Sequence, residues 1–275
     1  MQTAVERWQA IIDARAQQMD AAYGRLGRTS VDFWDRRAHG FHRVTKNSAA
    51  NDPFFLHVRQ NVTPETTVLD VGAGTGRFTL ALAPLVQHVT AVEPNARMLD
   101  YLRQDLHERE LTNVECLQTN WQDAPGDLSA DIVICSHVVY PIRDIEPFLA
   151  KLQAATRRSC YLYVRATPID AATAHLWRHF HGEERHFTPA YIHVLDVLFE
   201  MGIYANVETV TLPPSMRYPS VDVAVEELLE QLILPGDAQT RSELRRLVEP
   251  WLVERDGALV PPGEKIVCAI IRIDL

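Results

Sequence analysis

Short apolar runs alternate with amphipathic segments through the middle of the chain. The segments near 77–86, 95–109 and 143–156 carry apolar residues at helical spacing. The runs between and around them lie at 67–72, 88–93, 114–118, 131–137 and 160–166. Continuous apolar runs are typical of strands that are covered on both faces, and strands that alternate with helices form parallel sheets. The pattern therefore predicts an α/β fold with helices on both sides of a sheet.

The ends of the chain have a different pattern. Residues 4–23 place apolar side chains on one helical stripe, and residues 213–264 contain two further stripes of this kind. Two more apolar runs, at 206–212 and 265–273, are expected to be strands, so the predicted sheet has about seven strands. One helical addition therefore precedes the predicted strands, and the other lies between the last two.

A glycine-dense turn follows the first predicted strand. Residues 70–76 read Asp-Val-Gly-Ala-Gly-Thr-Gly and lead into a predicted helix. Glycines at such a turn allow a sharp change of direction and let a ligand approach the backbone closely. Glu93 ends the next strand, 21 residues after Gly72, where a Rossmann-type fold has a carboxylate for ribose hydroxyls. This spacing predicts a cofactor that contains adenosine.

Two details favour one type of cofactor. The third glycine of a dinucleotide-binding G-x-G-x-x-G motif would fall on Arg77, whose bulk suits close helix–strand packing poorly. Asp70 stands two residues before Gly72, and its carboxylate would repel a pyrophosphate but attract an ammonium or sulfonium group. The site thus favours a ligand without phosphates that is positively charged at one end. A nicotinamide-dependent oxidoreductase on a similar core stays as an alternative.

Residues 70–76 resemble the first motif of class I, Rossmann-like S-adenosylmethionine-dependent methyltransferases of the small-molecule type. The resemblance extends over about residues 54–167. It implies a doubly wound, mostly parallel seven-stranded sheet with an antiparallel last strand and a helical cap. It also implies that S-adenosyl-L-methionine is the cofactor and that its methyl group passes to a small-molecule acceptor. A non-catalytic protein that binds S-adenosylmethionine is the second alternative.

The resemblance also implies roles for particular residues. Asp70 would lie beneath the amino-acid part of the cofactor, and Glu93 would bind the ribose hydroxyls. Asn120 stands where the family usually has an acid that contacts the adenine amine, and Trp121 would border the same ring. The expected cofactor-binding residues are Asp70, Gly72, Ala73, Gly74, Gly76, Phe78, Glu93, Pro94, Asn120, Trp121, Ser136 and His137.

Acceptor chemistry is expected at the end of the fourth strand. His137 and Tyr140 are the candidate catalytic residues, because ligands of open α/β sheets bind at the carboxyl edge. The alternative is that His137 only packs against the cofactor or the lid. Phe33 and Trp34 are expected to belong to a lid, or else to an amphipathic helix docked on the core. The expected parts are an N-terminal helical lid (1–50), a cofactor-binding core (51–212), a helical cap insertion (213–264) and the last core strand (265–275).

Composition limits the partners and the compartment. The 275 residues carry a formal net charge of −9, which disfavours general nucleic-acid binding. The four cysteines form no C-x-x-C pair, and no apolar run is long enough for a bilayer. No signal-peptide pattern is present at the N-terminus, so we expect a cytoplasmic monomer or homodimer without a membrane partner. No metal is expected at the histidines, because no zinc motif surrounds them: His175, His179, His181 and His186.

Overall fold

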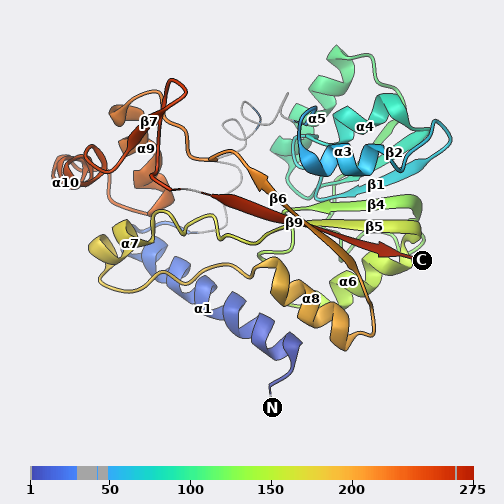
Figure 1. Cartoon of the computed structure of the whole chain (residues 1–275), viewed down its shortest axis with the longest axis horizontal. Helices are drawn as coiled ribbons and strands as arrows, with labels where there is room; N and C mark the ends of the chain where they lie inside the picture. Colours follow the sequence, from blue (N-terminus) through green and yellow to red (C-terminus); the bar gives the residue numbers. More distant parts are fainter. Residues whose placement is uncertain (1, 30–41, 43–48, 264) are drawn as a thin grey trace.

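A seven-stranded sheet forms the centre of the computed structural model, which describes residues 2–29, 42, 49–263 and 265–275 (Figure 1). Its strands are β1 (Thr67–Val71), β2 (His88–Val92), β3 (Val114–Leu117), β4 (Ala130–Ser136), β5 (Thr156–Arg165), β6 (Asn206–Leu212) and β9 (Ile266–Asp274). The order is β3-β2-β1-β4-β5-β9-β6. The first five strands pair in parallel, whereas β9 is antiparallel to both β5 and β6. The predicted sheet and its antiparallel last strand are therefore confirmed.

Helices cover both faces of this sheet, as the apolar runs predicted. One face carries α3 (Pro53–Arg59), α4 (Thr79–Leu82), the 3-10 turn η1 (Ala83–Leu85) and α5 (Ala96–Glu108). The other face carries α1 (Ala4–Arg25), α6 (Ile145–Ala154) and α8 (Tyr191–Glu200). Successive residues of one strand point to opposite faces of the sheet and pack against different helices. Val68 packs with Phe54 of α3, while Leu69 packs in the cluster of Trp8 and Phe148.

The helix expected near 77–86 is shorter than its pattern suggested. It consists of the single turn of α4 and the 3-10 turn η1. Pro84 lies in this 3-10 turn, and a proline cannot donate the backbone hydrogen bond that would continue an α-helix. The connection between β1 and β2 is therefore compact.

A second group of helices lies beyond the carboxyl ends of the parallel strands (Figure 1). It comprises α7 (Ala174–His181), α9 (Val221–Gln231), α10 (Ala238–Val248) and a hairpin of β7 (Val253–Arg255) and β8 (Ala258–Val260). These elements share their own cluster of buried side chains, which also includes Ala22 and Tyr23 from the end of α1. The long helix α1 therefore connects this group with the face of the sheet.

The β7–β8 hairpin was not predicted. Its two-residue loop is Asp256-Gly257, and both residues have positive φ angles, of 49° and 70°. An Asp-Gly pair is a local signal for such a turn, and here it lies between Val-Glu-Arg and Ala-Leu-Val. The signal was present in the sequence, but the strands of three residues are too short to show a clear alternation. Among the described residues, no helix has the length and apolar character needed to span a membrane.

Candidate cofactor and acceptor site

The glycine turn after β1 is fixed by close packing. The backbone N–H groups of Gly72 and Ala73 both donate to the Val92 carbonyl at the end of β2, at 2.8 and 3.1 Å. Gly72 has a φ of +75°, and a Cβ there would lie 2.3 Å from Cγ2 of Val138. Gly76 has a φ of +87°, and a Cβ there would meet Leu102 at the same distance. Any other residue at these two positions would strain the backbone and displace a neighbouring side chain.

Glu93 ties the turn to the end of the neighbouring strand. Its Oε2 accepts a hydrogen bond from the Gly74 N–H and its Oε1 accepts one from the Asn95 N–H, each at 2.9 Å. Burial raises the pKa of the Glu93 carboxyl, and the two backbone donors oppose this shift. Each carboxylate oxygen keeps a second lone pair. The group can therefore accept further hydrogen bonds while it holds the turn.

Asp70 is enclosed by the protein. Its side chain is buried, and its Oδ2 accepts a hydrogen bond of 2.6 Å from the hydroxyl of Thr79 at the start of α4. Burial raises the pKa of Asp70 to about 6; the Thr79 hydroxyl opposes this shift and the Glu93 charge adds to it. Asp70 thus joins β1 to α4, and it is a carboxyl group that titrates close to neutral pH.

The side chain of Arg77 leaves the turn and pairs with Asp52. Its Nη2 lies 2.5 Å from Oδ2 of Asp52, whose Oδ1 accepts the Phe54 N–H and caps α3. Phe78 is buried and packs edge-on against Phe54, with ring centroids 5.0 Å apart. The bulk of Arg77, which disfavoured a dinucleotide motif, is thus accommodated by an ion pair with the segment that precedes β1.

The other expected cofactor residues differ in exposure. Asn120 is exposed, and its side chain donates to Asp123 at 3.2 Å. Trp121 is buried in the core cluster of α6, with its ring 4.9 Å from Nζ of Lys151. Ala73 is buried, Pro94 is exposed and Ser136 is half-buried. Phe33 and Trp34, expected in a lid, lie outside the described residues.

His137 and Tyr140 are brought together at the end of β4. The Tyr140 hydroxyl lies 3.0 Å from Nδ1 of His137 and accepts the backbone N–H of Arg165 at 2.8 Å. His137 has a positive φ of 60°, which is uncommon outside glycine and often marks functional positions. Its ring also lies 4.8 Å from that of Tyr163. The pair is thus held from β4 and β5 together.

The protonation state of His137 follows from these contacts. Burial lowers the pKa of His137 well below its usual value, and the charges of Arg165 and Arg77 lower it further. The ring is therefore neutral near pH 7. If the Tyr140 hydroxyl, which accepts from Arg165, donates its own proton to Nδ1 of His137, the ring proton of the neutral histidine lies on Nε2. In this arrangement Nε2 is a hydrogen-bond donor.

Comparisons with known proteins agree with this geometry. A family model described as a methyltransferase domain matches residues 68–159. An uncharacterized protein of Haemophilus influenzae is 30% identical over 184 residues, which cover 63% of this chain and 64% of that protein. The (S)-tetrahydroprotoberberine N-methyltransferase of Eschscholzia californica is 26% identical over 108 residues, or 38% of this chain and 31% of its own. The matches thus span less than two thirds of these curated relatives.

The fold has a counterpart among solved structures. The crystal structure of YcgJ from Bacillus subtilis superposes with a TM-score of 0.55 and 17% sequence identity. The superposition covers 80% of this chain and 97% of the YcgJ chain. In sequence, the same protein, an uncharacterized methyltransferase, is 32% identical over 82 residues. Residues 68–159 thus match a methyltransferase domain, on a fold shared with this solved structure. The domain contains the glycine turn, Glu93 and the His137–Tyr140 pair.

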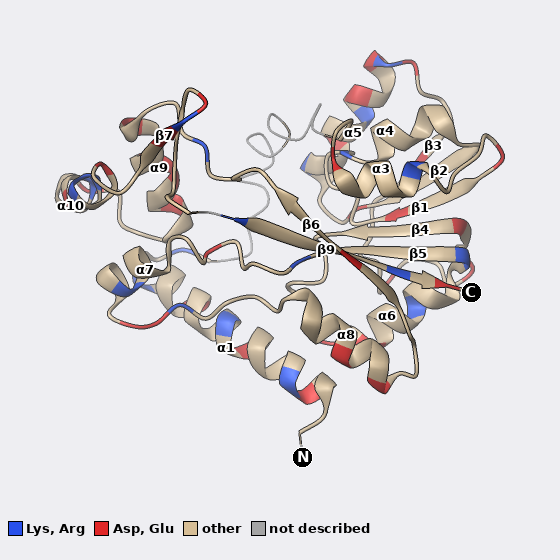
Figure 2. Ribbon diagram, viewed as in Figure 1, with Lys and Arg blue, Asp and Glu red and all other residues tan. Residues whose placement is uncertain are grey.

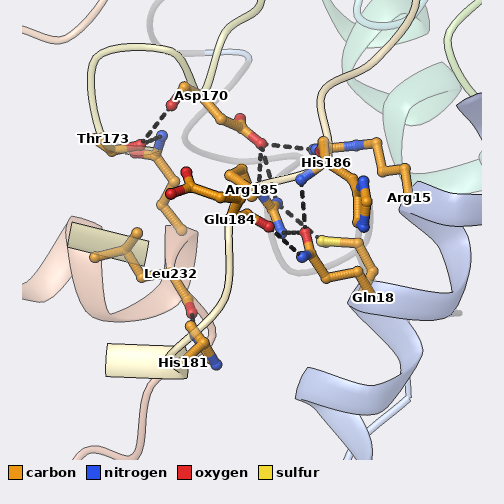
Figure 3. A network of polar contacts seen from close by, with 11 residues as sticks. Arg15, Gln18, Asp170, Thr173, His181, Glu184, Arg185, His186 and Leu232 are labelled. Carbon is orange, nitrogen blue, oxygen red and sulfur yellow. Dashed lines mark hydrogen bonds and ion pairs between the residues drawn. The ribbon is translucent and has the colours of Figure 1, made fainter. Parts of the chain in front are cut away.

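A buried polar network holds the chain that follows the methyltransferase domain (Figure 3). Asp170, in the loop after β5, receives hydrogen bonds from Arg15 of α1 at 2.7 Å and from Arg185 at 3.0 Å. Gln18 of α1 bonds the backbone of Glu184 and His186. The Arg185 guanidinium also lies 3.7 Å from the centroid of the Trp177 ring. The network fixes the loop after β5 and the segment after α7 to α1.

Opposite pKa effects act on this ion pair. Burial alone would raise the pKa of Asp170, but the two guanidinium groups outweigh it and lower that pKa. Burial lowers the pKa of Arg185 to about 10, which still leaves it protonated near neutral pH. Sequence reasoning missed this network, because its members are polar residues far apart in the chain. Nothing in the local pattern around Asp170 indicates its partners.

The histidines between 175 and 186 do not gather around one point. His179 lies 2.7 Å from Glu243, His181 is 2.8 Å from the Leu232 carbonyl, and His175 meets the ring of Trp251 edge-on. Over the described ranges, no three His, Cys, Asp or Glu side chains are close enough to hold a metal ion. Each of these three contacts joins α7 to another part of the helical group.

Proposed function

We propose that this chain transfers the methyl group of S-adenosylmethionine to a small-molecule acceptor. The observation that carries the proposal is the glycine turn held to Glu93 within a methyltransferase domain. Gly72 and Gly76 carry no side chain, and packing leaves no room for one there, so a ligand that lies against the turn would meet backbone. A carboxylate with free lone pairs adjoins it, as a ribose diol requires.

The residues present fit this cofactor. Glu93 would accept the ribose hydroxyls, and the turn from Gly72 to Gly76 would lie against the nucleoside and the amino-acid part. Asp70 would act from beneath the turn, as a buried negative charge that favours a positively charged group. Arg77 does not direct its positive charge into the turn, because its guanidinium is paired with Asp52. This arrangement suits a cofactor without phosphates.

At the acceptor end, His137 and Tyr140 would position the substrate. When bound, S-adenosylmethionine supplies a methyl group that leaves a sulfonium sulfur for a nucleophilic atom of the acceptor. We assign to His137 a hydrogen bond from Nε2 to the acceptor, because Nδ1 is occupied by the Tyr140 hydroxyl. Orientation of the acceptor for in-line attack is then the main contribution of this pair to the rate.

A small molecule suits the acceptor side better than a polymer. The helical group of α7, α9 and α10 lies beyond the carboxyl edge, and we assign to residues 213–264 the role of a cap over the acceptor. The net charge of −9 disfavours binding along a phosphate backbone. The relative from Eschscholzia californica is named as an N-methyltransferase of a tetrahydroprotoberberine, which is itself a small molecule.

We propose that the lid on the cofactor side lies in the part of residues 1–50 that follows α1, because α1 itself packs on a face of the sheet. His42, in this part, lies 2.9 Å from Asp105 and stacks on Tyr101, with ring centroids 4.4 Å apart. Both partners belong to α5, the helix that follows Glu93. A segment anchored there is in reach of the cofactor, which supports the assignment.

Calorimetric titration with S-adenosylhomocysteine tests the proposal, with NADH as the alternative ligand. We expect micromolar binding of S-adenosylhomocysteine and none of NADH. Glu93→Gln should weaken this binding about tenfold or more, because hydrogen bonds to a charged group are worth about 1.5–3 kcal/mol. Glu65→Gln is the matched control, since Glu65 is exposed just before β1 at the opposite edge of the sheet. Binding of NADH alone would overturn the proposal in favour of hydride chemistry.

A further inference from the structure

A hollow of about 360 Å³ lies where β5 ends and β9 begins. The strands are antiparallel neighbours, with Arg165 opposite Cys268, so the end of one meets the start of the other. Its walls are mostly apolar, and the principal lining residues are Arg165, Pro168, Ile169, Pro262, Lys265 and Ile266. The hollow therefore combines an apolar surface with two cationic side chains.

In the part of the chain that the structure describes, the two cations have no acidic counterpart. Among the described residues, no Asp or Glu lines the hollow, and no carboxylate forms an ion pair with Arg165 or Lys265. This is unusual in a chain of net charge −9. Figure 2 shows a basic position where β9 begins, whereas acidic positions are conspicuous on α8. Two unpaired cations beside an apolar wall leave an anion-binding position in the hollow.

The hollow adjoins the proposed acceptor position. The backbone N–H of Arg165 donates to the Tyr140 hydroxyl, which in turn contacts Nδ1 of His137. A single hydroxyl therefore links the residue that lines the hollow to the histidine at the end of β4. A molecule seated in the hollow would extend toward His137 without crossing another element of the sheet, since β4 and β5 are neighbours.

The wall of the hollow is held rigidly from outside. Its residues Pro168 and Ile169 immediately precede Asp170, whose carboxylate is fixed by Arg15 and Arg185 (Figure 3). The network thus sets the position of the loop that faces Lys265. A preformed site binds a small ligand with little loss of conformational freedom.

We propose that this hollow binds the acidic end of the methyl acceptor, and that the acceptor is a small apolar carboxylic acid. Arg165 and Lys265 bind the carboxylate, while Pro168, Ile169 and Ile266 contact the hydrocarbon part. One carboxylate has two acceptor oxygens, one for each of the two cations, and the apolar lining disfavours a ligand with several charges. This inference rests on the proposed methyl transfer, because it names the substrate class for that same site.

Binding of carboxylic acids to the complex with S-adenosylhomocysteine tests this assignment. The probes are benzoate, phenylacetate and octanoate, each compared by calorimetry with its uncharged amide. We expect at least one acid to bind about tenfold or more tightly than its amide, since a hydrogen bond to a charged group contributes about 1.5–3 kcal/mol. Equal binding of acid and amide, or binding of neither, would overturn the assignment.

Variants separate this inference from the proposed function. Arg165→Gln and Lys265→Gln should each weaken acid binding about tenfold, with S-adenosylhomocysteine affinity retained. Arg165→Lys should keep much of the acid affinity, which guards against a fold defect. Arg158→Gln is the matched control, because Arg158 is exposed near the start of the same strand. If the unmodified protein does not bind S-adenosylhomocysteine, the methyltransferase proposal is contradicted instead. If phenyl phosphate binds more tightly than any carboxylic acid, the assignment of a carboxylate ligand is overturned.

Discussion

The cofactor turn and the loop after β5 are both rigid, but they are held in different ways. The turn is fixed by contacts between residues close in sequence: the pairs Gly74–Glu93 and Asp70–Thr79 are separated by 19 and 9 residues. The loop is fixed by Asp170, which is 155 residues from Arg15, and by Gln18, which is 167 residues from Arg185. The first region can be built locally, whereas the second forms only when α1 has docked.

The comparison predicts that the loop is sensitive to loss of one charge. Asp170→Asn should lower the free energy of unfolding by about 3 kcal/mol or more, because it leaves the buried Arg185 guanidinium without its anion. Urea denaturation measures this loss. The paired Asp170 has a lowered pKa, so its contribution is present above the pKa of an unfolded Asp and is lost as the pH falls through the lower folded pKa.

An exposed ion pair in the same segment is the control for this prediction. Arg178 and Glu184 are paired at 2.8 Å, but their side chains are 62% and 74% exposed. Glu184→Gln should therefore change the free energy of unfolding by less than about 1 kcal/mol. Equal losses from Asp170→Asn and Glu184→Gln would show that burial of the network has no energetic importance.

The difference in sequence separation also explains what the sequence alone could predict. The glycine turn, Glu93 and the alternation of strands and helices along the chain follow from local patterns of apolar residues and glycines. The burial of Asp70 was not predicted, because it depends on the side of β1 from which α4 packs. The partners of Asp170 and the hollow at Arg165 depend on which distant segments meet, and neither residue has a distinctive local pattern.

At the cofactor turn, a single methyl group should be costly. Gly72→Ala should weaken S-adenosylhomocysteine binding about tenfold to a hundredfold, because the new Cβ would lie 2.3 Å from Val138 and the positive φ costs about 1–2 kcal/mol. Gly182→Ala separates these two causes. Gly182 has a φ of +72° at the end of α7, but a Cβ there meets nothing within 4 Å.

The control should lower stability without changing cofactor affinity. If Gly182→Ala also weakened S-adenosylhomocysteine binding, the effect of Gly72→Ala would reflect general destabilisation of the fold. The double change Gly72→Ala with Val138→Ala sharpens the result further. It restores space at the turn but leaves the backbone strain, so any recovery of binding measures the steric part alone.

The smallest expected effect at the turn is a dependence of cofactor affinity on pH. Burial raises the pKa of Asp70 to about 6, so this group is mostly ionised at pH 7.5 and mostly protonated at pH 5. If the ionised form favours the positive end of S-adenosylmethionine, affinity should fall about tenfold between these two values, since only about one tenth of the molecules then carry the competent charge.

Asp70→Asn isolates this contribution, because the variant keeps the shape of the side chain but cannot ionise. Its affinity should be low at both pH values, and any remaining pH dependence would belong to Glu93, whose pKa is also raised by burial. S-adenosylhomocysteine keeps the ammonium group but lacks the sulfonium charge. A pH dependence shared by both ligands would therefore assign the attraction to the ammonium, and one confined to S-adenosylmethionine would assign it to the sulfur.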